Sequence, residues 1–330
     1  MKQFILAVIV LIGWTIAFTP IEANALTISP VRFEILGDPG QTLIGEITLF
    51  NERDIAETFY SSFESFEARG EGGEPRFVPA QKGLPAWIKT EPKITLEPGE
   101  TKIVPFSIEI PEDADPGGHF AAIFWSNVPP TEREGEQMVV GARIGTLVLL
   151  RVSGEIREGG GVLEFGAENI IYTHLPISFF YRLANDGNNW LRPEGNINIS
   201  NIIGLRTITL DANPVKGNVL PGSIRRFDVE WEAQDEITEG GFLTIARHQW
   251  QNFAIGPYRA TLALRYNGTD TLSETEISEG FKSTFWFFVI PWQLLIIIII
   301  VLVILGFFGA KGLNKYNRWV IAKYKNLEKK

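Results

Sequence analysis

A long uncharged stretch lies near the C-terminus of this chain, at residues 285–310 (FWFFVIPWQLLIIIIIVLVILGFFGA), and limits how the chain can fold. A helix of 26 residues is about 39 Å long, at about 1.5 Å per residue. The hydrocarbon core of a bilayer is about 30 Å thick. The stretch is therefore predicted to be one transmembrane helix. Trp286 and Trp292 are expected at the headgroup level, and Pro291 near the start of the continuous helix.

The two ends of the chain predict how this helix is oriented. Residues 311–330 hold seven Lys or Arg and one Glu, and basic flanks stay in the cytoplasm. At the other end, Lys2 precedes an apolar run, residues 4–18, and the small-x-small pattern of residues 23–25. This order is typical of a secretory signal peptide over residues 1–25, with an uncleaved anchor as the alternative. The prediction is a single-pass protein of the cell membrane, with exported N-terminal domains and a basic cytoplasmic tail.

The tail itself has two interpretations. Its apolar residues recur every three to four positions between residues 313 and 327, which suits a short helix on the anionic inner leaflet. A solvated basic flank explains the same residues equally well. Neither interpretation gives the tail a catalytic role.

Charge and cysteine content limit what the exported part does. Residues 26–310 contain 22 Lys or Arg and 37 Asp or Glu, so they carry a net charge of −15, and this acidity argues against nucleic acid as a partner. The chain has no cysteine, which excludes a disulfide scaffold. Stability must then come from hydrophobic cores, and about 255 exported residues are enough for two. An exported chain without cysteine is typical of a bacterial protein.

Short alternating apolar runs fill the exported part. Residues 43–49, 104–110 and 258–266 alternate apolar with polar side chains, and Gly, Pro, Asn and Asp separate such runs. A period of two predicts half-buried antiparallel strands, and this spacing of turns is typical of a β-sandwich.

Three markers recur in the same order in two halves of this region. They are an Asn that ends a strand, a Pro-Gly turn and a glycine that opens a strand: Asn51, Pro98-Gly99 and Gly117-Gly118, then Asn185, Pro221-Gly222 and Gly256. Pro and Gly fit the dihedral angles of a tight turn, and Asn after a strand tolerates the left-handed conformation. The repeat predicts two copies of one sandwich domain, residues 26–154 and 155–281, with a hinge at residues 158–161.

The first copy resembles a known family. The run ITLEPGETK at residues 94–102, the strand FSIEIP at 106–111 and the Gly-Gly opening at 117–118 are similar to motifs of the Gram-positive WxL-interacting proteins. Residues 26–51 are similar as well, whereas the loop at 68–83 does not match. The resemblance implies two tandem immunoglobulin-like β-sandwich domains before a single transmembrane helix. It also implies a peptidoglycan-associated first domain and a second domain that binds partner proteins.

The sequence gives no sign of catalysis. The chain has three histidines at unrelated spacings and no cysteine nucleophile, and it lacks the zinc-protease, nucleophile-elbow and P-loop motifs. We therefore predict that it is not an enzyme and needs no cofactor or metal. The Asp- and Asn-rich runs at residues 112–115 and 185–189 leave calcium as an alternative, although neither has the full spacing of an EF-hand.

Recognition is expected in loops, because loops on a rigid sandwich usually carry it. Trp190 and Asn188 lie in the polar run NDGNNWLRPEG, and Arg76 and Phe77 lie in the loop at 68–83. We predict these four as ligand or partner contacts. For Trp190, packing over one end of the sandwich is the alternative. Trp231 falls on the apolar face of the repeat and is predicted to belong to the core.

These features predict a non-enzymatic, membrane-anchored binding protein of the cell envelope. Its exported domains are expected to bind peptidoglycan, another surface protein or both. The alternative is a chaperone-like or scaffold subunit of a secretion or pilus system, which holds its clients with an exposed edge strand.

Overall fold

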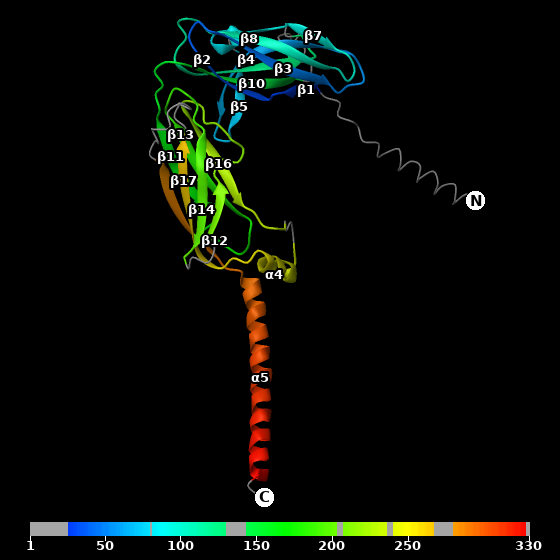
Figure 1. Ribbon diagram of the computed structural model, residues 1–330, viewed down its shortest axis with the longest axis vertical. Coiled ribbons are helices and arrows are strands. Elements are labelled where there is room, and N and C mark those ends of the chain that lie inside the picture. The colour runs from blue at the N-terminus through cyan, green and yellow to red at the C-terminus, as the bar shows by residue number, and fades with distance from the viewer. Residues whose placement is uncertain are drawn as a thin grey trace, which may run out of the picture. The chain divides into compact units, whose positions relative to one another are not determined.

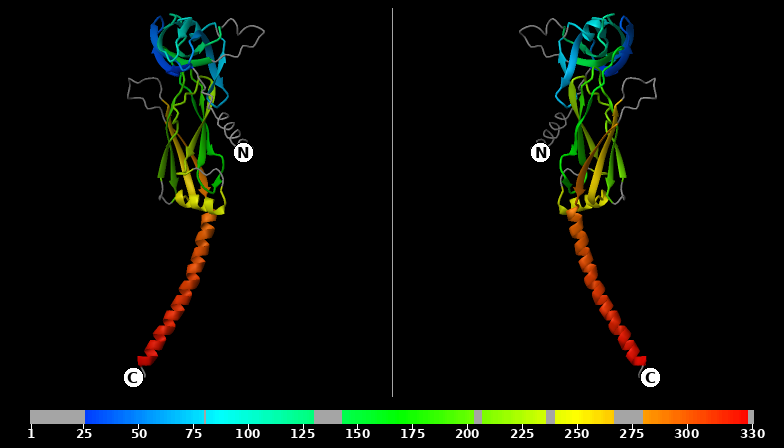
Figure 2. Two further views of the ribbon diagram at one scale, coloured as in Figure 1. Left: turned by 90° about the vertical axis from the view of Figure 1, so that its right-hand side faces the viewer. Right: turned by 90° about the vertical axis from the view of Figure 1, so that its left-hand side faces the viewer.

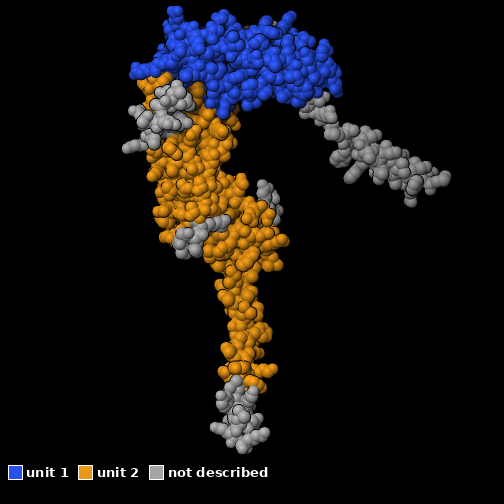
Figure 3. All heavy atoms as spheres, viewed as in Figure 1, with its two compact units in different colours: residues 1–67, 75–155 blue, residues 68–74, 156–330 orange. Residues whose placement is uncertain are grey.

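A computed structural model describes residues 26–79, 81–129, 143–202, 207–235, 240–266 and 280–327. The predicted signal peptide at residues 1–25 lies outside these ranges. The chain divides into two compact units, residues 1–67 with 75–155 and residues 68–74 with 156–330 (Figure 3). Each unit holds one β-sandwich, which confirms the predicted all-β fold class.

The first sandwich packs two sheets face to face. One sheet has the order β1-β3-β8-β6: Leu26–Ser29, Thr42–Asn51, Thr101–Glu109 and Ile88–Thr90. The other has the order β2-β10-β9-β4-β5, with β7 also on β4: Arg32–Gly37, Arg143–Val152, Gly117–Ser126, Glu57–Arg69, Glu74–Val78 and Lys93–Leu96. A short helix, α2 (Leu84–Trp87), precedes β6.

Alternation of side chains builds the core of this sandwich. Ile47 and Leu49 of β3 are fully buried, as are Val104 and Ile108 of the neighbouring β8. Trp125 of β9, in the opposite sheet, is also fully buried and packs in the same core. The side chains between these positions point away from the core, as the period of two predicts.

The second sandwich repeats this arrangement. Its smaller sheet has the order β11-β13-β16: Gly160–Ala167, Ile177–Asn185 and Ser223–Trp231. Its larger sheet has the order β12-β18-β17-β14-β15: Ile171–Tyr172, Phe281–Val289, Gly256–Tyr266, Pro193–Asn201 and Thr207–Asp211. In both sandwiches an early strand runs parallel to the last one, β2 on β10 and β12 on β18. Trp231 is 4% exposed and belongs to the core, as predicted.

The repeated Asn residues do the same work in both sandwiches. Asn51 and Asn185 are fully buried at the ends of β3 and β13. The amide group of Asn51 donates to the carbonyls of Leu96 and Glu97, just before the first Pro-Gly turn. That of Asn185 donates to the carbonyl of Val219, just before the second turn. The two copies therefore share this buried hydrogen-bonded asparagine as well as a similar strand order.

The C-terminal helix α5 (Trp292–Leu327) starts directly after Pro291, as predicted, but the first residues of the predicted membrane span are not helical. Residues 285–289 continue β18, in which Phe285, Phe287 and Val289 face the core and Trp286 and Phe288 face outward. The second sandwich consequently ends at Val289 rather than at residue 281. An uncharged run shows where polar groups are missing but not where a strand ends and a helix begins, so the strand was counted with the helix.

Two helices follow the β-strands of the second unit. Helix α4 (Phe242–Gln251) lies at the end of the sandwich beside the start of α5 (Trp292–Leu327) (Figures 1 and 2). Within the described residues, α5 is the one helix long and apolar enough to cross a membrane, over Trp292–Trp319, with a mean hydropathy of 3.0. The predicted tail helix is a continuation of α5 rather than a separate element.

Candidate functional site

An edge strand of a sandwich is a candidate binding surface, because it presents unpaired backbone N–H and C=O groups. Most edges in the described residues are protected in ways that discourage pairing. Strands β1, β6 and β12 have four residues or fewer, β5 contains Pro75, and β11 is interrupted by a bulge. Strand β2 carries an ion pair and β16 has four charged residues.

Strand β15 has none of these protections. It forms the outer end of the larger sheet of the second sandwich, and no other described strand pairs with its free side. Its sequence, TITLD, has no proline and no glycine, and its one charge is at the last position. Threonine and isoleucine are residues that favour extended backbone.

The register of β15 shows which backbone groups face outward. Leu210 lies opposite Ile197, and just beyond the strand the N–H of Ala212 donates to the carbonyl of Gly195 at 2.9 Å. Opposed residues in an antiparallel pair alternate between bonded and non-bonded pairs. Ile208 and Leu210 therefore bond to β14, and the N–H and C=O groups of Thr207, Thr209 and Asp211 point to the free side.

The sandwich core holds this strand in place from behind. Ile208 and Leu210 are half-buried and pack against the core. The hydroxyl of Tyr181 donates to the carbonyl of Ala212 at 3.0 Å, just after the strand, and the Tyr181 ring stacks on Phe227 at 4.9 Å. Burial raises the pKa of the Tyr181 hydroxyl well above its ordinary value, so it stays a neutral donor. The edge is thus presented on a rigid support.

Exposed aliphatic side chains flank both ends of the edge. Ile202 follows β14, next to the start of β15, and is 63% exposed. Val215 lies four residues after β15 and is 73% exposed, in a turn that Asn213 closes by donating to the carbonyl of Gly217 at 3.0 Å. An open edge between two apolar side chains is chemically suited to pairing with an extended peptide segment.

The predicted contacts of the second domain are largely used by the fold. Asn188 accepts a hydrogen bond from the N–H of Arg157 at 2.8 Å and donates its own N–H to the carbonyl of Arg157 at 3.1 Å. It therefore holds the chain that leads into β11. Trp190 is half-buried and has interactions of its own, which agrees better with packing on the sandwich than with a free contact. A binding role for either residue stays a prediction.

The predicted contacts of the first domain lie in a strand rather than in a loop. Arg76 and Phe77 belong to β5, and Arg76 forms an ion pair with Glu67. Phe77 packs edge-on against Phe124 at 4.8 Å. The guanidinium of Arg143 lies 3.4 Å from the centre of the Phe124 ring. Phe77 thus helps to cover the outer face of the larger sheet, and its role in binding also stays a prediction.

The described residues show no constellation for metal or acid–base chemistry. Among them, no group of three or more His, Asp or Glu residues is placed to hold a metal ion. Asn185, in one of the two runs considered for calcium, instead bonds backbone groups of its own domain. His119 bonds the carbonyl of Asp115 at 2.8 Å and packs on Trp87. That the chain is not an enzyme stays a prediction.

Comparison with known proteins gives relatives in structure alone. No family model and no curated protein matches the sequence. Among solved structures, the class 5 fimbriae chaperone CfaA is 10% identical, with 78% of this chain and 98% of that chain covered and a TM-score of 0.39. The E. coli chaperone DraB is 11% identical over 79% and 98% of the two chains, with a TM-score of 0.35. The Pseudomonas aeruginosa CupB2 chaperone is 8% identical over 80% and 100%, with a TM-score of 0.33.

Values this low carry no information about a ligand of this chain. None of these three structures is named as a WxL-interacting protein, and that resemblance stays a prediction. The edge of β15 also escaped the sequence analysis, for a physical reason. The sequence of an edge strand differs little from that of an inner strand, and the lack of a neighbour is decided by the fold.

Proposed function

We propose that this chain is a membrane-anchored binding protein of the cell envelope that pairs the edge of β15 with an extended segment of another exported protein. The observation that carries this proposal is the unprotected edge itself. Three residues of β15, Thr207, Thr209 and Asp211, direct their backbone N–H and C=O groups to the free side. Ile202 and Val215 are exposed at the two ends of the edge.

Backbone pairing explains why such a site needs no catalytic or metal-binding group. An added strand makes main-chain hydrogen bonds, which supply affinity with little dependence on sequence, and alternate side chains supply specificity. The preferred partner segment is extended and has β-branched residues, with apolar side chains positioned to contact Ile202 and Val215. This is the chaperone-like or scaffold interpretation rather than the peptidoglycan one.

The comparisons are compatible with this choice without deciding it. One similar structure is named as a chaperone–tip subunit pre-assembly complex and another as a pilin in complex with its chaperone. Those interactions belong to those proteins. For the present chain, binding of peptidoglycan by the first sandwich stays a prediction.

The anchor is the second part of the proposal. Helix α5 is placed across the membrane, with the basic residues 311–330 in the cytoplasm and both sandwiches outside. The apolar surface of α5 supports this placement, since Ile300, Leu302 and Leu305 are each more than half exposed. Resistance of the protein to extraction with alkaline carbonate, and protection of the tail from added protease in sealed spheroplasts, would test it.

The edge is tested by crosslinking on the full chain in its native membrane. A photoreactive amino acid at Thr207 is expected to form an adduct with one envelope protein, through an extended segment that mass spectrometry of the adduct identifies. Thr209→Pro removes one outward N–H and leaves the bonds to β14, because residue 209 does not bond across that ladder. The adduct should fall at least fivefold in this variant.

Thr209→Val is the matched control for the proline variant. It retains the N–H but removes the hydroxyl, which donates to the side chain of Asn198 at 2.9 Å. The adduct should persist in this variant. Equal adduct in the proline and valine variants would reject pairing at β15. Sedimentation of the full chain with isolated peptidoglycan, unaffected by either substitution, would indicate the wall-binding function in its place.

A further inference from the structure

Helix α4 exposes apolar side chains that a helix in water would bury. Leu243 is 73% exposed and Trp250 is 67% exposed, and Phe242 at the start of the helix is 41% exposed. Leu243 and Trp250 are seven residues apart and therefore lie on one face of the helix, with the buried Ala246 between them. A helix that presents an apolar face at its exposed side is typical of a membrane interface.

Buried amide groups fasten α4 to the beginning of α5. The side chain of Gln249 is 1% exposed and donates to the side chain of Gln293 at 2.6 Å and to the carbonyl of Thr173 at 3.1 Å. Its oxygen accepts the N–H of Leu294 at 3.0 Å, one of the free N–H groups in the first turn of α5. The position of α4 is therefore fixed relative to the membrane helix and not left to a flexible connection.

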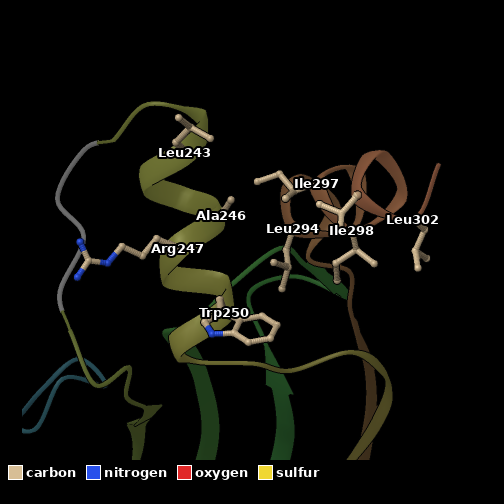
Figure 4. A pocket seen from close by; sticks show the side chains of 9 residues that line it. Leu243, Ala246, Arg247, Trp250, Leu294, Ile297, Ile298 and Leu302 are labelled. Atoms are coloured by element: carbon tan, nitrogen blue, oxygen red, sulfur yellow. The ribbon is translucent and has the colours of Figure 1, made fainter. Parts of the chain in front are cut away.

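A groove runs between the two helices (Figure 4). Its volume is about 420 Å³, within the roughly 300–1,000 Å³ of typical small-molecule sites. Figure 4 shows Ala246 and Trp250 of α4 directed toward α5, which contributes Leu294, Ile297 and Ile298. The walls of the groove are almost entirely hydrocarbon, so they suit an alkyl chain and not a polar ligand.

The groove is continuous with the surface that faces the membrane. The residues that α5 contributes extend from Leu294 to Leu302, which are the third and eleventh residues of the helix. At about 1.5 Å per residue, Leu302 lies about 15 Å below the start of α5, or half of a hydrocarbon core about 30 Å thick. The groove thus occupies the depth of one leaflet, the one nearer the second sandwich.

Arg247 of α4 brings a positive charge beside the groove. Arg247 contributes to the lining, and Figure 4 shows its guanidinium extending from α4 on the side away from α5. An arginine whose stem covers an apolar surface and whose charged end leaves it is well placed to meet phosphate groups at the membrane surface. Trp292 and Phe242, whose ring centres are 5.8 Å apart, add aromatic groups at the same level.

We infer that α4 lies in the headgroup region of this leaflet and that the groove holds an acyl chain of a phospholipid whose phosphate contacts Arg247. The inference rests on the proposed membrane anchor, because it requires α5 to cross the bilayer. It adds to that proposal a second membrane contact and a lipid site. Two contacts at fixed spacing restrict how the second sandwich tilts on its helix.

The absence of cysteine makes this testable on the full chain with single labels. An environment-sensitive fluorophore is attached to Leu243→Cys, to Ile304→Cys within α5, or to Leu163→Cys as a control. Leu163 is a leucine 55% exposed on β11. The proteins are reconstituted in phosphatidylcholine vesicles that contain phospholipids with a nitroxide at a chosen depth.

Nitroxide lipids labelled near the headgroup should quench the Leu243 label at least threefold more than the Leu163 label. Deeply labelled lipids should quench the Ile304 label. If the Ile304 label is not quenched, the membrane anchor itself is wrong. If the Ile304 label is quenched and the Leu243 label behaves like the Leu163 label, the anchor stands and the inference about α4 is wrong.

The lipid site is tested by native mass spectrometry of the protein released from phospholipid nanodiscs. The wild type should retain one phospholipid, and Leu243→Glu should reduce that population at least fivefold while Leu163→Glu leaves it unchanged. Arg247→Glu should reduce it as well, and Arg247→Lys should not. Equal retention in all variants would overturn the site. A disulfide-linked dimer through Leu243→Cys, formed in place of lipid quenching, would show that a second copy covers this face instead.

Discussion

Replacing Asn185 with alanine should destabilise the second sandwich alone. The buried side chain of Asn185 makes three hydrogen bonds: its amide donates to the carbonyls of Asn189 and Val219, at 2.7 and 2.8 Å, and its oxygen accepts the N–H of Gly187 at 3.0 Å. Each buried bond contributes about 1 kcal/mol net. The carbonyl of Val219 keeps a second donor, the N–H of Leu191, so we expect a total loss of about 3 kcal/mol.

This loss translates into a measurable shift of the melting temperature. The second sandwich has about 130 residues, and unfolding entropy near 60 °C is about 2.1 cal/mol/K per residue, or about 0.27 kcal/mol/K in total. Asn185→Ala should therefore lower its unfolding temperature by about 10 °C. Differential scanning calorimetry of the full chain in detergent would measure it, with hydrogen exchange of β13 and β3 to assign each transition.

Asn51→Ala is the matched variant in the first sandwich. Asn51 is equally buried and its amide donates to the carbonyls of Ile55, Leu96 and Glu97 at 2.9–3.2 Å. It should lower the transition of β3 by a similar amount and leave that of β13 in place. The reasoning is refuted if either variant shifts its own domain by less than 3 °C, or if one substitution lowers both transitions equally.

Three further substitutions probe the supports of the sandwiches and of helix α5. Tyr181→Phe should lower the free energy of unfolding by about 1 kcal/mol, because the hydrogen bond to Ala212 is lost. Burial raises the pKa of Tyr181 above its ordinary 10.0, so the wild type should also lose stability above pH 10 and the variant should lose less. Urea unfolding at pH 8 and 10.5 would measure both effects. Gln249→Leu should cost about 2 kcal/mol and speed hydrogen exchange at the amide of Leu294; unchanged exchange would contradict the proposed fastening of α4 to α5. Arg143→Met breaks a partly exposed ion pair with Glu64 of β4. The free energy of unfolding of the first sandwich should therefore fall by only about 1 kcal/mol. A loss several times larger would show that this pair is part of the core.

Local pattern was enough to predict much of the architecture. The alternating runs at residues 43–49 and 104–110 predicted β3 and β8, because a strand that buries one face must alternate. The recurrence of Asn51 as Asn185, each before a Pro-Gly turn, indicated two copies of one fold. Trp231 was assigned to the core from its place in the repeat, and the structure confirms this.

Features that depend on neighbours were not predictable in the same way. Phe285 and Phe287 read as part of a membrane helix until β17 is seen beside them as a hydrogen-bonded partner. Phe77 was expected in a recognition loop, but β5 places it against Phe124. In both cases the predicted element was wrong for the same reason: the local sequence does not show which distant segment an apolar side chain packs against.

Sequence reasoning alone was enough to predict strand-rich domains, the lack of a disulfide and one C-terminal segment apolar enough for a membrane. These properties follow from composition and from the short-range period of the side chains. Three features became visible only in the folded domain: residues 285–289 belong to β18, β15 has a free edge, and α4 faces α5 across an apolar groove. Each of these depends on which distant segments meet, and pairing between segments is settled by packing of the whole domain rather than by any local run of residues.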